Sequence, residues 1–166
     1  MLTSHEIMGF MSPNQAAEIL NYAYESDKPL YHALTKAVAE ARKLRPVFLE
    51  RQPRPERHRD MIATLSRPAL DLVTGNLIRT WLLKKYSPML ADFLDALGIT
   101  HKEGVVDDLP ATVDDDKLRS GVDTLLAKYP PEVVAIYLQA FNEMNEADWP
   151  NLKAMLESDQ RLQLKG

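Results

Sequence analysis

Residues 29–44 read PLYHALTKAVAEARKL and contain the clearest periodic pattern in the chain. Apolar side chains recur three or four positions apart, a spacing that places them on one face of an α-helix. This face is formed by Leu30, Ala33, Leu34, Ala37, Val38, Ala41 and Leu44. We expect the helix to end before Pro46, because a residue that precedes proline avoids the helical backbone conformation.

The same spacing recurs along most of the sequence, between breaks that contain proline. It predicts about eight helices, at residues 13–24, 29–44, 55–65, 68–82, 87–97, 114–129, 131–144 and 149–156. Alternation of apolar and polar residues never persists long enough to indicate a strand. The predicted fold class is therefore all-α, an irregular multi-helix bundle with no significant sheet.

Length and composition indicate one globular domain. A chain of 166 residues, of which 45% are hydrophobic and 27% charged, is long enough to bury its own core. We expect residues 1–166 to form a single helical domain. Residues 1–11 and 159–166 are expected to be loosely ordered, because the ends of a chain fray.

The residue types also limit the location and the chemistry. The chain has no cysteine, which excludes disulfides, thiolate metal sites and cysteine nucleophiles. No basic region precedes an apolar run at the N-terminus, so no signal peptide is predicted. The longest uncharged stretch, residues 7–17, is too short to span a membrane. We therefore expect a cytoplasmic protein with no membrane partner.

Positive charge is concentrated in one segment of an acidic chain. Residues 42–67 contain eight basic and three acidic residues, whereas the net charge of the whole chain is −4. Residues 103–116 contain six acidic residues and no basic one. Such an asymmetry is typical of a partner-binding surface, and also of charges that pair within the molecule.

The basic segment supplies the candidate residues for binding a partner or an anion. These are Arg45, Arg51, Arg54, Arg57 and Arg59. Guanidinium groups suit bidentate contact with carboxylate or phosphate. We expect Arg51 and Arg54 on a short extended stretch held by prolines, and residues 47–49 in the core. The arginines are either solvated or paired internally, or they bind an external anionic partner, or they meet residues 103–116 of the same or a second chain.

The acidic stretch is a weaker candidate for a metal site. His101, Glu103, Asp107 and Asp108 offer nitrogen and oxygen ligands, but their spacing matches neither an EF-hand nor an HExxH motif. A nucleophile elbow, a P-loop and a dinucleotide motif are absent from the sequence. The sequence therefore predicts no catalytic residue, no metal ligand and no cofactor.

Aromatic and methionine residues near the N-terminus leave a further choice open. The residues concerned are Met8, Phe10, Met11, Tyr22, Tyr24 and Tyr31. They either close one end of the bundle or form an exposed anchor for a partner.

These patterns favour a non-enzymatic helical interaction module. It would bind an acidic protein surface, or self-associate, through the segment rich in arginine and proline. The alternative is a weak nucleic-acid or phosphate binder that uses the same arginines. A metal-dependent enzyme that uses residues 101–108 is the third interpretation. The expected partner is accordingly a protein or a second copy of this chain, with nucleic acid as the weaker option.

Overall fold

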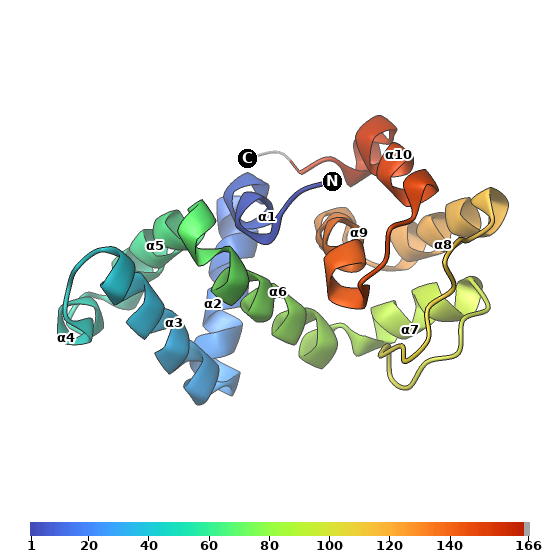
Figure 1. The fold of residues 1–166 in the computed structure, drawn as a ribbon. Coiled ribbons are helices and arrows are strands. Elements are labelled where there is room, and N and C mark those ends of the chain that lie inside the picture. Colours follow the sequence, from blue (N-terminus) through green and yellow to red (C-terminus); the bar gives the residue numbers. More distant parts are fainter. Residues whose placement is uncertain (165–166) are drawn as a thin grey trace. The chain divides into compact units, whose positions relative to one another are not determined.

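The computed structural model is built almost entirely from helices (Figure 1). It describes residues 1–164. The structure is 74% helical, with ten α-helices and no strand among the described residues. None of these helices has the length and apolar character needed to cross a bilayer. The prediction of an all-α, multi-helix fold without a sheet is confirmed.

Contacts group the described chain into two compact units, Leu2–Trp81 and Leu82–Leu164. The first, the N-terminal unit, contains α1 (Ser4–Phe10), α2 (Pro13–Ser26), α3 (Lys28–Ala41), α4 (Pro46–Glu50), α5 (Arg54–Leu65) and the 3-10 helix η1 (Pro68–Leu70). The second, the C-terminal unit, contains α7 (Ser87–Ala96), α8 (Asp115–Lys128), α9 (Pro131–Asn145), α10 (Pro150–Ser158) and the 3-10 helix η2 (Gln160–Leu162). Helix α6 (Asp71–Lys85) starts in the first unit and ends in the second. A single domain for the whole chain stays a prediction.

Side-chain caps begin several helices at the residues expected from the sequence. The Ser12 hydroxyl accepts a hydrogen bond from the Gln15 N–H at 3.2 Å, and Pro13 occupies the first position of α2. Asp27 caps α3 in the same way, and Asp114 caps α8. Local sequence therefore sets these helix starts.

The N-terminal residues are more ordered than the sequence suggested. Residues 4–10 form α1, which packs against α5 and η1. The buried side chains at this end are Ile7, Met8 and Met11. The backbone N–H of His5 also donates to Asp71 at 2.9 Å. Burial of three apolar side chains overrides the tendency of a chain end to fray.

A short helix, α4, forms next to the stretch that was expected to be extended. Arg51 has helical backbone angles at the end of α4, and Arg54 is the first residue of α5. Proline at a first helical turn starts a helix, so the prolines here begin α4 and α5 rather than hold a long extended stretch. Val47 and Phe48 are 40% and 52% exposed, so their prediction as core residues is wrong, whereas Leu49 is buried as expected.

The helix predicted at residues 68–82 is divided into η1 and α6. Leu77, Ile78 and Trp81 are buried as predicted. Leu72 was assigned to the same apolar face, yet it is 87% exposed. At about 100° per residue, Leu72 lies on the opposite side of the helix from Trp81.

The core of the N-terminal unit lies between α2, α3 and α5. Helix α2 packs against α3 and α5, and α5 also contacts α1 and α3. The fully buried side chains include Ile19, Leu20, Leu34, Val38, Leu49, Met61 and Leu65. Each such side chain contributes roughly 1.5–3 kcal/mol when it leaves water. This core fixes α2 and α5 against each other.

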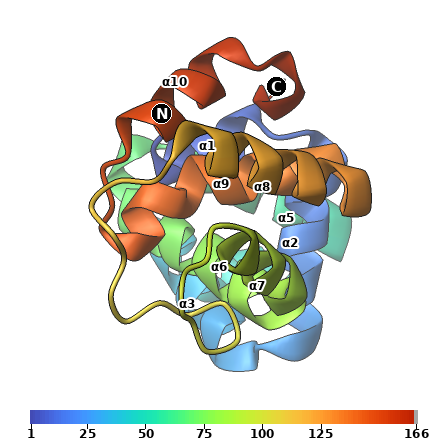
Figure 2. The same cartoon turned by 90° about the vertical axis from the view of Figure 1, so that its right-hand side faces the viewer.

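In the C-terminal unit, α7 and α8 pack closely. A Cβ atom added to Gly121 of α8 would lie 3.4 Å from the Phe93 ring of α7, so the glycine allows the two helices to approach. The Phe93 ring centre lies 5.7 Å from that of Tyr137 and 5.5 Å from that of Phe141. The loop between α7 and α8 runs along the outside of this helix pair (Figure 2).

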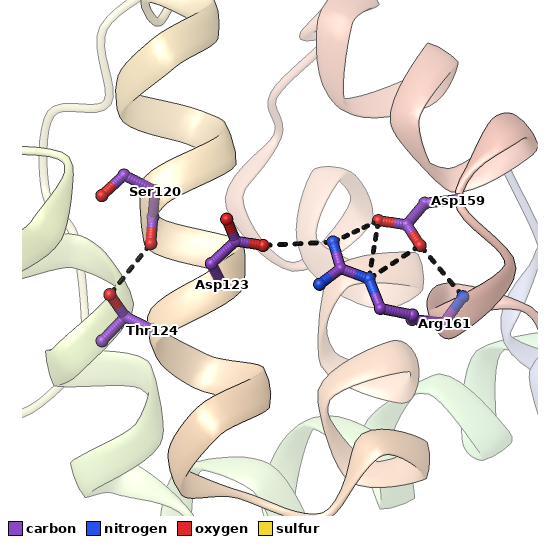
Figure 3. A network of polar contacts seen from close by, with 5 residues as sticks. All are labelled: Ser120, Asp123, Thr124, Asp159 and Arg161. Atoms are coloured by element: carbon purple, nitrogen blue, oxygen red, sulfur yellow. Dashed lines mark hydrogen bonds and ion pairs between the residues drawn. The ribbon is translucent and has the colours of Figure 1, made fainter.

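An ion-pair network joins η2 to α8 (Figure 3). The Arg161 guanidinium donates to Asp159 at 2.7 Å and to Asp123 of α8 at 3.1 Å. Leu162 is buried beside this network. Residues 159–163 thus make specific contacts, whereas the sequence predicted a loosely ordered end, and residues 165–166 lie outside the described residues.

Two glycines in the first half of the loop between α7 and α8 have positive φ but different surroundings. Gly98, which follows α7, has φ of +70° and no atom within 4 Å of an added Cβ. Gly104 has φ of +86°, and an added Cβ would lie 2.7 Å from the Cβ of Leu90. Both positions disfavour a side chain, and only Gly104 also lacks the space for one.

The alanine variants of these glycines test the close contact. Gly98→Ala should lower the free energy of unfolding by about 1 kcal/mol, from backbone strain alone. Gly104→Ala should lower it by about 3 kcal/mol, because overpacking against Leu90 adds to the strain. Urea denaturation followed by circular dichroism measures both values. Equal losses for the two variants would contradict the contact.

Candidate functional site

The five candidate arginines do not share one surface. Arg45 and Arg51 flank α4, and Arg54, Arg57 and Arg59 lie in the first half of α5. Four of them are exposed, whereas Arg57 is only 9% exposed. The predicted set therefore divides into one buried residue and two exposed pairs.

Arg57 points into the N-terminal unit. One of its terminal nitrogens donates to the carbonyl oxygen of Glu50 at 3.2 Å. Its guanidinium carbon lies 5.7 Å from the ring centre of Tyr24 and 5.8 Å from that of Tyr31, within the range of a cation–π contact. Because Arg57 is enclosed in this way, we do not include it among the residues that contact a partner.

Arg54 lies against the C-terminal half of α2. Its guanidinium carbon is 4.4 Å from the ring centre of Tyr24, and a terminal nitrogen is 3.6 Å from the Glu25 carboxylate. Both charged side chains are largely exposed, so this ion pair contributes little to stability. A carboxylate from a partner can therefore replace Glu25 at low cost.

His58 lies beside the same tyrosine rings and is 4% exposed. Its Nε2 atom is 2.8 Å from the Tyr31 hydroxyl. Burial, together with the positive charges of Arg57 and Arg54, lowers the pKa of His58 to about 4. His58 is therefore neutral at pH 7, and the positive charge in this region belongs to the arginines.

Helices α1, α2 and α5 enclose an open groove of about 1040 Å³. One wall is formed by α5, through Arg54, Pro55, His58, Arg59, Ile62, Ala63 and the following Ser66. The other wall is formed by α2, through Pro13, Ala16, Ala17 and Asn21. The floor is formed by Met8, Gly9 and Met11. The groove lies entirely within the N-terminal unit.

The lining residues of α5 follow a helical stripe. Successive members of the stripe are four residues apart, as in the series that ends at Ile62 and Ser66. At about 100° per residue, Arg54 and Arg59 lie about 140° apart around the helix axis. Four lining residues lie between the two guanidinium groups around the helix, His58, Ile62, Pro55 and Ser66, and Ala63 lies about 40° beyond Arg59.

The groove is mainly apolar, and glycine and alanine form part of its lining. Met8 and Met11 are 1% and 3% exposed, so the floor is closed, and methionine adapts its shape to different ligands. Gly9 and Ala63 are exposed and Ala17 is partly exposed, so a backbone can approach closely along the walls. The lining suits an apolar surface that enters between two helices.

The electrostatic character of the groove is positive. Among the described residues that line it, none is acidic. Arg59 is exposed and has no ion pair within residues 1–164. An anionic group at the edge of the groove would therefore meet an available cation.

Sequence reasoning identified Arg54 and Arg59 but not the groove between α2 and α5. It left open whether Met8 and Met11 form an exposed anchor, and the structure places them on the groove floor. The sequence signal for the groove was Ile62, an apolar residue that lies outside the buried stripe of α5. An apolar residue away from the core face of a helix indicates a second contact surface.

The acidic stretch is organised by His101. Its Nδ1 accepts a hydrogen bond from the Gly104 N–H at 3.1 Å, so Nε2 carries the proton and donates to Asp95 at 2.7 Å. Both ring nitrogens are thus occupied within the C-terminal unit. Throughout residues 1–164, no group of three His, Asp or Glu side chains is arranged to hold a metal ion.

No family model, curated protein or solved structure matches this chain. The function proposed below therefore rests on the groove, its charges and the surfaces of the N-terminal unit.

The depressed pKa of His58 predicts a loss of stability in mild acid. The unfolded chain binds the proton near pH 6.5 and the folded chain near pH 4, so stability falls as the pH drops between these values. Between pH 7 and pH 5 the free energy of unfolding should decrease by about 2 kcal/mol from this residue. His58→Gln should remove that part of the decrease, as measured by urea denaturation at both pH values. His32→Gln, at an exposed position, is the control and should leave the decrease unchanged.

Proposed function

We propose that this protein is a non-enzymatic helical interaction module, which binds an acidic amphipathic helix of a partner protein in the groove between α2 and α5. The supporting observation is the combination of a mainly apolar groove with two exposed guanidinium groups, those of Arg54 and Arg59, on its α5 wall. A helix that presents an apolar face with acidic residues on its flanks is complementary to both features.

The dimensions of the groove suit about three turns of helix. The α5 wall extends from Arg54 to Ser66, a rise of about 18 Å. Both walls are helices, so a third helix can pack between them by the usual interdigitation of side-chain ridges. Apolar residues of the partner at positions i, i+3, i+4 and i+7 would enter the groove.

Arg54 and Arg59 give this interaction its selectivity. Arg59 has no ion pair in the described part of the chain, and the exposed pair of Arg54 with Glu25 can be exchanged. Carboxylates on the flank of the partner helix that faces α5 would then meet both cations. Charge complementarity of this kind contributes to association rate and register more than to raw affinity.

The other interpretations of the sequence stay predictions. Binding of nucleic acid or phosphate, or self-association through the same arginines, loses support because Arg57 is buried and the other four are divided between α4 and α5. A metal-dependent reaction at residues 101–108 has no ligand group among the described residues. A cytoplasmic location is part of this proposal, and a chain without cysteine is compatible with it.

Two labelled helical peptides test the groove. Both have about fourteen residues with leucine at the i, i+3, i+4 and i+7 spacing, and their flanking residues are glutamate in one and lysine in the other. In fluorescence anisotropy, the glutamate peptide should bind about tenfold more tightly than the lysine peptide. Ala63→Glu introduces a carboxylate into the groove and should weaken binding of the glutamate peptide about tenfold or more.

Matched variants exclude indirect effects. Ala33→Glu makes the same change at an exposed position of α3 outside the groove, and it should leave peptide binding unchanged. Arg59→Glu leaves one cation and one anion on the α5 wall, and it should abolish the preference for the glutamate peptide. Equal affinity of the wild-type protein for the two peptides, or equal losses for Ala33→Glu and Ala63→Glu, would contradict the proposal.

A further inference from the structure

Residues 42–48 comprise the turn that follows α3 and the first three residues of α4, and every one of them is exposed. Leu44, Val47 and Phe48 are 40%, 40% and 52% exposed. They are three of the seven large hydrophobic side chains that are exposed in the described chain, and they lie within five positions. We call residues 42–51 the α4 tip, which lies at the outer edge of the N-terminal unit (Figure 1).

The backbone holds these apolar side chains away from the core. Helix α3 ends in a left-handed turn at Lys43, where φ is 56°, and the Leu44 N–H donates to the Ala39 carbonyl oxygen at 2.8 Å. Leu49, at 1% exposed, is the one buried side chain of the tip. The tip is therefore a helical protrusion that Leu49 anchors to the core, with the hydrogen bond from Arg57 to the Glu50 carbonyl and the pair of Arg42 with Asp60 as further contacts.

Basic side chains accompany the exposed apolar ones. They are Arg42, Lys43, Arg45 and Arg51. Arg42 pairs with Asp60 at 3.4 Å, and the other three have no ion pair within the described residues. Glu50 is the one acidic residue of the tip, so its net charge is positive.

We propose that the α4 tip binds the surface of an anionic lipid bilayer. Phe48 and Val47 would enter the headgroup region, and the basic side chains would contact phosphate and carboxylate headgroups. The sequence analysis predicted no membrane partner because no segment can span a bilayer. Contact through a protruding tip needs no such segment, since apolar insertion and electrostatic attraction together suffice for peripheral binding.

The shape and composition of the tip favour a lipid surface over other partners. Phe48 is the one aromatic residue of the tip, so there is no series of rings on which successive nucleobases could stack. Two copies of the tip would bring like charges together, which opposes self-association. A bilayer surface adapts to a protrusion, whereas a folded partner would need a cavity of matching shape. No residue of the tip lines the groove between α2 and α5, so the two surfaces are separate.

Phe48→Trp supplies a direct readout of insertion. Trp81 and Trp149 are both 0% exposed, so a change in fluorescence on adding vesicles reports on position 48. Vesicles of phosphatidylcholine with about 30% phosphatidylserine should shift the emission to the blue and sediment the protein. Pure phosphatidylcholine vesicles should bind about tenfold less, and salt at about 0.5 M should weaken binding to the anionic vesicles.

Single variants separate the apolar and charged contributions. In co-sedimentation of the protein with its native Phe48, Phe48→Ser and Arg51→Glu should each lower binding to anionic vesicles about tenfold. Both positions are exposed, so circular dichroism should show an unchanged fold. Leu72→Ser removes an apolar side chain that is 87% exposed and lies outside the tip, and it should have no effect.

The outcomes distinguish the tip from the groove. Ala63→Glu should keep full vesicle binding, and Phe48→Ser should keep full binding of the glutamate peptide. Equal binding to neutral and anionic vesicles, or equal losses for Leu72→Ser and Phe48→Ser, would overturn the proposal. A blue shift with single-stranded oligonucleotide or with polyglutamate, but not with anionic vesicles, would also overturn it and would assign the tip to that partner.

Discussion

The inward-facing side chain of Arg57 makes the contacts on which the arrangement of helices in the N-terminal unit depends. From α5, its guanidinium reaches Tyr24 of α2 and Tyr31 of α3, and it donates to the carbonyl oxygen of the last residue of α4. One side chain therefore links four helices. Burying a guanidinium costs free energy unless its N–H groups are hydrogen-bonded and other contacts replace the water that it loses. Here the rings of Tyr24 and Tyr31 replace part of that water. The neighbouring His58 is uncharged at neutral pH, so no second charge is buried beside it.

Both surfaces that we propose to bind partners follow from this orientation. Once Arg57 faces inward, the helical repeat places Arg54 and Arg59 about 60° and 160° away from it around α5, and both line the groove. The bond from Arg57 to the end of α4 also fixes that short helix, whose apolar residues other than Leu49 face solvent. The groove and the α4 tip are thus two consequences of how one helix is rotated about its axis.

The sequence predicted the longer helices, whose boundaries depend on local chemistry, but not the short helices α1 and α4. Ser12 and Asp114 accept backbone hydrogen bonds from residues only two or three positions away, so a single sequence reveals them. Whether an arginine is buried or exposed is not decided by its neighbours in the sequence. Arg57 and Arg59 are the same residue type on one short helix, and the choice of the buried one depends on Tyr24 and Tyr31, which are far away in the chain. Single-sequence periodicity contains no information on that pairing.

The basic segment also acquires a physical explanation that its composition alone did not provide. Arg57 is enclosed, Arg42 pairs with Asp60, and Arg54 has Glu25, so part of the positive charge is used within the unit. The remaining unpaired arginines lie next to exposed apolar side chains, at the groove and at the α4 tip. An exposed apolar group gives no stability to the fold, and an unpaired surface charge gives little. Folding stability therefore does not explain why exposed apolar groups and unpaired positive charges occur together at two places. Binding to partners that are both apolar and anionic explains it.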